Sequence, residues 1–440
     1  MENREMQNNA GHLVIGGCDV VELAMQWGTP LSVFDEELAA NNARMYREAL
    51  SSLPEYEIIF AGKALLTVGI ARFMTNLGLS LDVVSGGELY IALTAGVPAQ
   101  RIFFHGNNKT AADLGTALDL GVGRIVVDNL YELELLSDLA QKKKRTADIL
   151  LRIMPGVEAH THSYIQTGQL DSKFGISVAH NQAIDAVKLA CSLPGLRLRG
   201  VHCHIGSQIF ELASYAKTID VMMSLIAEAE ALGIELTELN LGGGLGIKYI
   251  DGDQPASIRD FGAYLTGALK SAAAKYNLRL PKIMVEPGRS LVGAAGTTVY
   301  RIGSIKENKG SRTYAAVNGG MADNPRVALY QAKYRAVVAN KMDQAPEHTY
   351  TIVGQFCESS DVLINSIELP QLEPGDLLAV FCTGAYNYAM ASNFNAVPRM
   401  PIVTVYRGQS DLVVERETYQ DLIRLHRIPD RWLKDGVEGG

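Results

Sequence analysis

Two charged side chains lie beside short apolar runs, where active sites are often built. Lys63 follows the run at residues 57–61 by two positions, and Asp82 lies inside the run at residues 80–84. An amine held between apolar walls is poorly hydrated, which favours its neutral, nucleophilic form. Taken alone, Lys63 also fits a surface lysine. Asp82 is harder to explain structurally, because a carboxylate inside an apolar run is costly without a partner.

A histidine segment offers a second kind of chemistry. His202 and His204 are alternate residues, so on a strand they share one face. With Cys203 they could suggest a metal site, but the spacing matches no standard zinc pattern and Cys203 would face the opposite way. We therefore favour a histidine stacked on a flat cofactor, with Ser207 close behind it in the chain.

Two glycine-containing segments follow the seventh and eighth apolar runs. Barrels of alternating strands and helices often bind phosphate in the loops after strands 7 and 8. Glycine there lets backbone N–H groups approach the anion, while an acidic residue in the second segment could face a cofactor ring. The residues concerned are Gly243 and Gly244 in the first segment, and Glu286, Pro287, Gly288 and Arg289 in the second.

Three polar clusters lie in the last third of the chain. Each of them could by itself be an ordinary turn. The clusters are Asp323 to Arg326 with Tyr330, Cys357 to Asp361 including Glu358, and Gly384 to Asn395 including Tyr386.

The apolar runs alternate with helix-like stretches through the first two thirds of the chain. This alternation predicts parallel βαβ units, and eight such units are the number in a TIM barrel. A doubly wound sheet is the alternative. The barrel is favoured because glycine-rich turns follow many runs and polar residues gather at the run ends, where barrel active sites are built. The runs are residues 57–61, 80–84, 102–105, 124–127, 149–153, 200–204, 238–241 and 282–285.

Amphipathic patterns between these runs predict the helices that cover the barrel. Ser85 fits the start of one helix, and Glu88 three residues later predicts a capping box there. The patterns span residues 68–77, 87–95, 111–120, 130–140, 181–192, 213–232 and 258–275.

After residue 293 the pattern changes to strand-like runs separated by turn signals, which predicts a mostly antiparallel β domain. Strand character near the N-terminus, at residues 13–15 and 31–34, predicts that this part joins the β domain. We therefore expect an α/β protein with a TIM (β/α)8 barrel and a C-terminal β domain. The expected divisions are an N-terminal segment at 1–35, a cofactor-binding barrel at 36–293 and the β domain at 294–440. The later strand-like runs are residues 298–305, 314–317, 349–353, 377–381, 402–406 and 411–414.

Composition excludes several other classes of protein. The net charge is −8, from 48 acidic and 40 basic residues, and the chain has no basic footprint typical of nucleic-acid binding. Its five cysteines are scattered without a CxxC pair, which argues against a disulfide framework or a zinc site. The N-terminus lacks an apolar signal core, and no apolar run approaches the ~20 residues that span a bilayer. We expect a reduced, cytoplasmic protein without nucleic-acid or membrane partners.

Taken together, the motifs resemble those of the decarboxylases that depend on pyridoxal 5'-phosphate (PLP) and have an alanine-racemase-like barrel. Within that group they resemble the diaminopimelate decarboxylases. The similar segments occur in the expected order from about residue 57 to 395, and one departure is Leu65, where relatives often have Asn. The segments are FAGKA, SLDVVSGGEL, HGNNK, SKFGI, HCHIGSQI, LNLGGGLGI, VEPGRS, NGGMADNPR with Leu329-Tyr330, CESSD and GAYNYAMASNFN.

The resemblance implies a role for each candidate residue. Lys63 is expected to hold PLP as a Schiff base, Glu286 to pair with the ring nitrogen, and His204 to stack on the ring. Cys357 is expected to donate a proton after CO₂ leaves, and Glu358 to bind the distal ammonium group. Both would act in the site of the neighbouring subunit, which implies a homodimer. The expected further contacts to the cofactor are Asp82, Ser207, Gly243, Gly244, Pro287, Gly288, Arg289 and Tyr386, and those to the distal end of the substrate are Arg289, Arg326, Tyr330 and Tyr386.

The activity implied by this resemblance is the decarboxylation of meso-2,6-diaminopimelate to L-lysine and CO₂, the last step of lysine biosynthesis. The alternatives are a decarboxylase of ornithine, arginine or carboxynorspermidine, an amino-acid racemase, and a non-catalytic PLP-binding homologue. Arg289, Arg326 and Glu358 favour a substrate whose distal end carries both a carboxylate and an ammonium group, since ornithine lacks the distal carboxylate. The C-terminal motifs favour a decarboxylase over a racemase.

Overall fold

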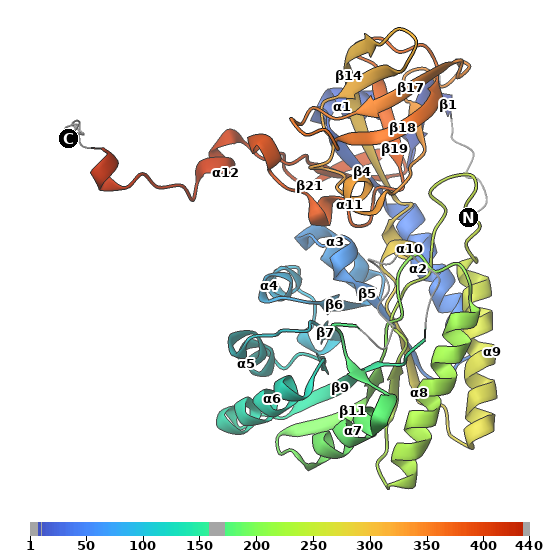
Figure 1. The fold of residues 1–440 in the computed structure, drawn as a ribbon, viewed down its shortest axis with the longest axis vertical. Coiled ribbons are helices and arrows are strands. Elements are labelled where there is room, and N and C mark those ends of the chain that lie inside the picture. The colour runs from blue at the N-terminus through green and yellow to red at the C-terminus, as the bar shows by residue number, and fades with distance from the viewer. Residues whose placement is uncertain (1–7, 10, 158–171, 434–440) are drawn as a thin grey trace.

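The computed structural model of the chain describes residues 8–9, 11–157 and 172–433. It contains a barrel of parallel strands surrounded by helices and, beside it, a second body built around a mostly antiparallel sheet (Figure 1). The first residues of the predicted 1–35 segment lie outside the described residues. No helix in the described part of the chain combines the length and the apolar character that crossing a bilayer requires.

Eight parallel strands close into the predicted TIM barrel. The last barrel strand pairs with the first, with Val285 beside Ile58, and this pairing closes the ring. A short strand, β10 (Ile176–Ser177), pairs in parallel with the last two residues of β9 and is not part of the ring. The barrel strands are β5 (Tyr56–Ala61), β6 (Ser80–Val83), β7 (Ile102–Phe104), β8 (Arg124–Val127), β9 (Ala147–Met154), β11 (Leu196–His202), β12 (Glu238–Asn240) and β13 (Lys282–Val285). All eight predicted runs are confirmed as strands.

Helices pack around the barrel with one apolar face inward. In α9, for example, Phe261, Leu265 and Leu269 recur every four residues and are buried. All seven predicted helices are confirmed, while α2 and the short α10 were not predicted. The helices are α2 (Glu36–Leu50), α3 (Val68–Asn76), α4 (Gly86–Thr94), α5 (Ala111–Leu120), α6 (Leu130–Lys143), α7 (Gln182–Ser192), α8 (Ala213–Ala231), α9 (Ile258–Tyr276) and α10 (Arg289–Val292).

The predicted capping box at the start of α4 is only half correct. Ser85 accepts a hydrogen bond from the backbone N–H of Glu88, as an N-cap residue does. The Glu88 carboxylate, however, accepts from the N–H of Val84 rather than from that of Ser85. The Glu88 side chain therefore connects the last residue of the predicted run 80–84 to α4 and does not complete the capping box.

The second body contains a sheet in the order β18-β17-β15-β14-β4-β20-β21, with β19 and β16 branching from β14. The N-terminal strand β4 lies between β14 and β20, so the prediction that an N-terminal strand joins this sheet is confirmed. The predicted strands are all present, but β16 and β18 were not predicted. The strands are β4 (Leu31–Asp35), β14 (Gly296–Glu307), β15 (Thr313–Val317), β16 (Ala336–Val338), β17 (His348–Val353), β18 (Val362–Leu369), β19 (Leu377–Phe381), β20 (Ile402–Tyr406) and β21 (Gln409–Val414).

Before β4 the chain forms a small sheet of β1 (Asn8–Asn9), β2 (His12–Ile15) and β3 (Cys18–Asp19), followed by α1 (Val20–Trp27). We keep as a proposal the division of the chain at residues 35 and 293. It falls just before α2 and shortly before β14.

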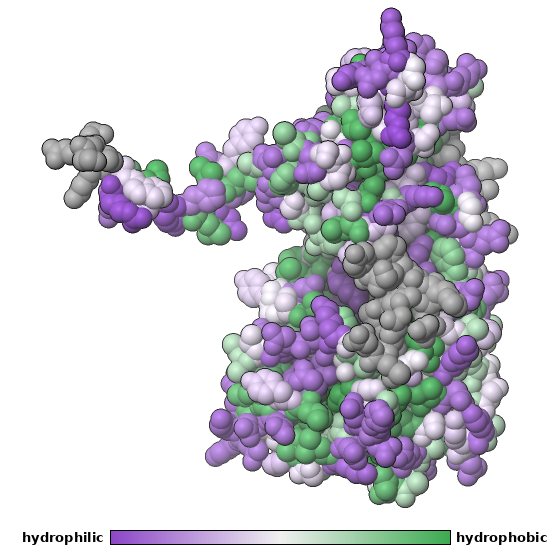
Figure 2. All heavy atoms as spheres, in the orientation of Figure 1, coloured by the Kyte–Doolittle hydropathy of each residue, from purple (hydrophilic) through white to green (hydrophobic). Residues whose placement is uncertain are grey.

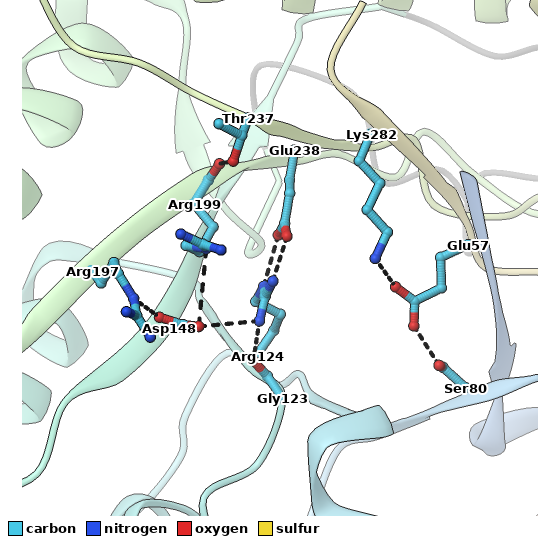
Figure 3. Close-up of polar contacts among 10 residues, drawn as sticks. All are labelled: Glu57, Ser80, Gly123, Arg124, Asp148, Arg197, Arg199, Thr237, Glu238 and Lys282. Carbon is cyan, nitrogen blue, oxygen red and sulfur yellow. Dashed lines mark hydrogen bonds and ion pairs between the residues drawn. The ribbon is translucent and has the colours of Figure 1, made fainter. Parts of the chain in front are cut away.

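The two ends of the barrel interior differ in character. Its middle is filled by a buried apolar cluster of Ile59, Phe103, Val126, Leu150 and Met284, which come from five strands. At the amino-terminal strand ends this apolar layer gives way to charged side chains (Figure 3). In barrels of this type the amino-terminal end serves stability, and the carboxyl ends carry the active site.

Arg124 is the central residue of that charged layer. Its guanidinium group donates to both carboxylate oxygens of Glu238, one at 2.7 Å, and lies 3.4 Å from Asp148 (Figure 3). Arg124 begins β8 and Glu238 begins β12, which are not neighbours in the sheet. The ion pair therefore links opposite parts of the barrel wall. Nearby, Lys282 donates to Glu57 at 2.5 Å, joining β13 to β5.

We predict that Arg124→Met destabilises the barrel. Glu238 is only 6% exposed in this ion pair, and a largely buried carboxylate left without its partner costs roughly 2–4 kcal/mol. The midpoint of thermal unfolding, followed by circular dichroism, should fall by several degrees. Arg197→Met is the matched control, because Arg197 also pairs with Asp148 but its side chain is 59% exposed. Equal losses in the two variants would contradict this role of Arg124.

Candidate active site

A cavity of about 750 Å³ opens where the barrel strands end, between the barrel and the second body. It receives side chains from strand ends around the barrel and from the segment after β15. Most of the predicted site residues meet here: Lys63, Asp82, His204, Ser207, Glu286, Arg289, Arg326, Tyr330 and Tyr386 line the cavity. Gly243, Gly244 and Gly288 line an adjoining hollow that shares Lys63, His204 and Ser207 with it. Strand ends far apart in the sequence thus converge on one site.

Lys63 lies in a single 3₁₀ turn, η1 (Gly62–Ala64), directly after β5. Its side chain is exposed toward the cavity, while its neighbours Gly62 and Ala64 are buried. A Cβ atom at Gly62 would lie 2.6 Å from the carbonyl oxygen of Asp82, so glycine allows the turn to pack against β6. Charged and imidazole side chains such as Asp82, His204 and Glu286 line the cavity together with apolar surface. The expectation of apolar walls around Lys63 stays a prediction.

Glu286 is a buried carboxylate with three polar neighbours. It accepts from Asn240 Nδ2 at 2.7 Å and from His202 Nε2 at 3.2 Å, and His105 Nε2 lies 2.9 Å from it. Burial alone would raise the pKa of the Glu286 carboxyl, but His105 and His202 hold it well below its usual range. Burial lowers the pKa of His202 to about 4 despite the adjacent carboxylate, so at neutral pH this ring is an uncharged N–H donor. The arrangement fixes a negative charge at the cavity wall.

The same cluster bears on the metal alternative for the histidines. Ligand atoms of His105, His202 and Glu286 lie within 4.8 Å of one another. A metal-bound imidazole normally donates its other N–H to a neighbouring acceptor, but Nδ1 of His202 is buried with no hydrogen-bond partner in the described part of the chain. We therefore interpret the cluster as an oriented carboxylate. Cys203 is fully buried and does not line the cavity.

The glycine segment after β12 makes room for a small group beside the backbone. Gly244 has a φ of +114°, and a Cβ atom there would lie 2.5 Å from the carbonyl oxygen of Gly206. At Gly243 it would lie 2.1 Å from the carbonyl oxygen of Glu286. Ser207 accepts from Arg289 Nη2 at 2.9 Å at the same place. A hydroxyl, a guanidinium group and glycine backbone thus surround this hollow, which suits a phosphate.

The loop after β13 packs against the lysine turn. The carbonyl oxygen of Pro287 accepts from the N–H of Ala61 at 3.2 Å. A Cβ atom at Gly288 would lie 3.0 Å from the Cβ atoms of Ala61 and Ala64. Pro287 therefore has a structural contact, and its predicted contact with the cofactor stays a prediction.

Two buried guanidinium groups form the far wall of the cavity. Arg289 donates to Tyr249 Oη at 2.5 Å and lies 4.7 Å from the centre of the Tyr386 ring. Arg326 donates to Tyr334 Oη at 2.6 Å and lies 4.7 Å from the ring of Tyr249. Among the described residues, neither guanidinium group forms an ion pair with a carboxylate. Buried arginines that contact only neutral hydroxyl groups and aromatic rings leave their charge for an anionic ligand.

Cys357 and Glu358 are placed differently from the other predicted site residues. Both are exposed in the loop between β17 and β18, and neither lines the cavity. The N–H of Cys357 donates to Asn395 Oδ1 at 2.9 Å. The N–H and hydroxyl groups of Ser360 donate to Glu358 and lower the pKa of its carboxyl. Their expected action in a neighbouring subunit stays a prediction.

Several residues at the cavity were missed by sequence reasoning. His105 and Asn240 orient Glu286, Tyr249 and Tyr334 support the arginines, and Arg152 lines the cavity beside Asp128, 3.8 Å away. His105, Asn240 and Arg152 share a signal that could have revealed them. Each is a polar residue within or directly after a buried strand run, as Asp82 is.

The residues that converge here fit PLP. That cofactor needs an amine for its aldehyde, an anionic partner for its ring nitrogen and a cradle for its phosphate. Lys63, Glu286 and the glycine hollow supply these three in one site. Two buried polar atoms without hydrogen-bond partners among the described residues, Asp82 Oδ1 and Arg289 Nε, remain for a ligand to satisfy.

Comparison with known proteins identifies the family. Residues 40–293 match the family model of the pyridoxal binding domain of pyridoxal-dependent decarboxylases. The chain is 49% identical to diaminopimelate decarboxylase of Halalkalibacterium halodurans, over 95% of this chain and 96% of that one. It is 48% identical to the Bacillus subtilis enzyme of the same name, over 98% of both chains. The chain belongs to the diaminopimelate decarboxylase family.

A solved structure of the family supports this assignment independently. The crystal structure of diaminopimelate decarboxylase from M. jannaschii in complex with L-lysine superposes with a TM-score of 0.91 at 35% identity. The match covers 98% of this chain and 99% of that one. Both the barrel and the second body are therefore those of a diaminopimelate decarboxylase.

We predict that His202 makes stability depend on pH. Between the ordinary histidine pKa of about 6.5 and about 4, the unfolded chain binds a proton that folded His202 does not. Stability therefore falls as the pH falls through this window, by on the order of 3 kcal/mol in all. In His202→Gln, the midpoint of thermal unfolding should decrease less steeply between pH 7 and pH 5 than in the wild type.

His180→Gln is the matched control for this measurement, because His180 is exposed on a surface turn. It should keep the wild-type slope. A His202→Gln protein with the wild-type slope would show that another group controls the acid response.

Proposed function

We propose that this chain decarboxylates meso-2,6-diaminopimelate to L-lysine and CO₂, as a PLP-dependent carbon–carbon lyase in the last step of lysine biosynthesis. The observation that carries the proposal is the pair of buried guanidinium groups, Arg289 and Arg326, in the same cavity as Lys63 and Glu286. A substrate that keeps a carboxylate at its far end gives these charges a partner. The names of the relatives and the L-lysine bound in the M. jannaschii enzyme support the same reaction.

In this proposal PLP supplies an electron sink for cleavage of a bond next to the substrate amine. Lys63 would hold it, and His204 would stack on its ring. Ser207, Gly243, Gly244 and the backbone from Glu286 to Arg289 would hold its phosphate, with Asp82 and Tyr386 as further contacts. This assignment is supported by the way in which these side chains line one cavity and its adjoining hollow.

Glu286 has the task of keeping a positive charge at the ring nitrogen. A carboxylate accepts roughly four hydrogen bonds. Asn240 and His202 take two of those positions, and His105 Nε2 lies 2.9 Å away. We assign a remaining position to the ring nitrogen. Because the donors keep Glu286 ionised, it can hold a proton on the nitrogen throughout the reaction.

The distal end of the substrate carries a carboxylate and an ammonium group, and the proposal assigns each its own partner. Arg289, Arg326, Tyr330 and Tyr386 bind the carboxylate, and Glu358 binds the ammonium group. Because this recognition requires both charges, ornithine, which lacks the distal carboxylate, would leave the two arginines unpaired. The site residues therefore favour diaminopimelate over the other basic amino acids.

The complete site, in this proposal, belongs to a homodimer. Cys357 and Glu358 are exposed, and neither lines the cavity of their own chain. We assign them to the cavity of the second subunit, where Cys357 returns a proton to the carbon that has lost CO₂. Five free cysteines fit a reducing compartment, and we propose the cytoplasm.

We predict that the holoenzyme releases CO₂ from meso-diaminopimelate and that Lys63→Ala reduces this release to background. Arg326→Met should keep PLP, measured by its visible absorbance, but raise KM for diaminopimelate by about tenfold to a hundredfold, because a charged hydrogen bond is lost. Ornithine, arginine and carboxynorspermidine are the comparison substrates. Faster release from any of them would favour that alternative, and bound PLP without CO₂ release would favour a non-catalytic homologue.

A second prediction tests the sharing of residues between subunits. Lys63→Ala and Cys357→Ala should each be inactive alone. When the two chains are co-expressed, half of the dimers combine them, and each mixed dimer contains one intact site. About a quarter of the wild-type activity should therefore return. If mixing restores nothing, then Cys357 acts within its own chain or not at all.

A further inference from the structure

The chain ends in an arm that leaves the second body (Figure 1). This C-terminal arm, residues 416–433, follows β21 and contains α12 (Tyr419–Ile423) and the turn η7 (Asp430–Trp432). Figure 2 shows it standing clear of the barrel and carrying hydrophobic side chains along its length. The large apolar side chains that it exposes are Tyr419 (78%), Ile423 (56%), Leu425 (73%), Ile428 (65%), Trp432 (68%) and Leu433 (63%).

The rest of the chain does not hold the outer part of the arm. Every described hydrogen bond from residues 418–433 stays within the arm, such as the capping box between Thr418 and Asp421. A five-residue helix is too short to be stable alone in water. Exposed apolar residues in this number mark a surface that another body covers.

The root of the arm connects it to the site residues. Glu417 forms an ion pair with Arg399 and accepts from Asn393 Nδ2 at 2.6 Å. Two residues further along that loop, Asn395 accepts from the N–H of Cys357. The arm and the exposed Cys357 loop are thus anchored on one short segment, so a neighbour that covers this segment can meet both.

Exposed aromatic side chains also lie on the side toward which the arm projects. There α4 and α6 face outward beside the barrel (Figure 1). Tyr90 on α4 is 73% exposed and Tyr131 on α6 is 72% exposed, with Leu130 and Val84 also exposed nearby in the chain. A neighbour placed on this side would cover both the arm and these helices.

We propose that the C-terminal arm packs onto a second copy of this chain and clasps it, so that two arms are exchanged in a symmetric dimer. A second copy is the occupant because the arm shares its anchor with the Cys357 loop, which the proposed function, on which this inference rests, assigns to the partner's cavity. In a two-fold dimer each arm reaches the same patch on the other chain, and both are buried together.

The test compares Ile423→Asp combined with Ile428→Asp against Met25→Asp. Met25 is 70% exposed on α1, away from the arm, so its variant controls for an added surface charge. By sedimentation, the arm variant of the holoenzyme should raise the dimer dissociation constant by at least about tenfold, with a circular dichroism spectrum like that of the wild type. Unchanged dissociation, or a monomeric wild type, would overturn the proposal.

A photoreactive benzophenone side chain at Tyr419 identifies what the arm touches. A covalent dimer on a denaturing gel supports the second copy, whereas crosslinks only within one chain overturn it. The proposed function is tested separately, by CO₂ release at a protein concentration where the variant is dimeric. If the wild type forms arm-dependent dimers but does not decarboxylate diaminopimelate, only the proposed function is rejected. If the enzyme is fully active but its dimers do not depend on the arm, only the role of the arm is rejected.

Discussion

Glu286 carries a negative charge in a position that is only 6% exposed, and the barrel provides the groups that keep it charged. Its three polar neighbours come from different strands or strand ends: His105 after β7, His202 on β11 and Asn240 on β12. In the register of the sheet, His202 lies beside Asn240. A slip by one residue would turn these side chains to the other face of the sheet. The charge therefore depends on exact strand alignment.

Opposite charges at the other end of the barrel favour the same alignment. Arg124 reaches Glu238 across the amino-terminal end, while Asn240, two residues further along β12, reaches Glu286. Residues two apart on a strand point to the same face, so one short strand serves both the ion pair and the site. The apolar layer between them, which contains Met284, separates the two sets of charges.

The barrel could be predicted from the sequence because each strand is a nearly continuous apolar run, as buried parallel strands are. The elements that were missed lack such a signal. The buried face of α2 contains Ala39, Asn42 and Ala43, and these small or polar side chains do not form a clear apolar stripe in the sequence. The strand β18 exposes much of its length, so its apolar residues do not form a clear run.

Site residues were predictable where a motif follows a barrel strand, because the carboxyl ends of the parallel strands all lie at the same end of the barrel. Lys63, Glu286 and the glycines were found in this way. His105 and Asn240 were missed because their role is to hold another residue, and only the closed barrel shows which one. Cys357 does not line the cavity of its own chain, so its predicted role rests on the proposed second subunit and not on the structure of one chain.

The position of β4 has a consequence for how the protein is made. This strand lies at residues 31–35, yet it sits between β14 and β20, and β20 is among the last elements to be synthesised. The barrel has all its strands once residue 285 has left the ribosome. The second sheet must wait until nearly the whole chain exists, because contacts between distant parts of a sequence form slowly. Until β20 exists, at least one edge of β4 is unpaired and is a target for aggregation or chaperone binding.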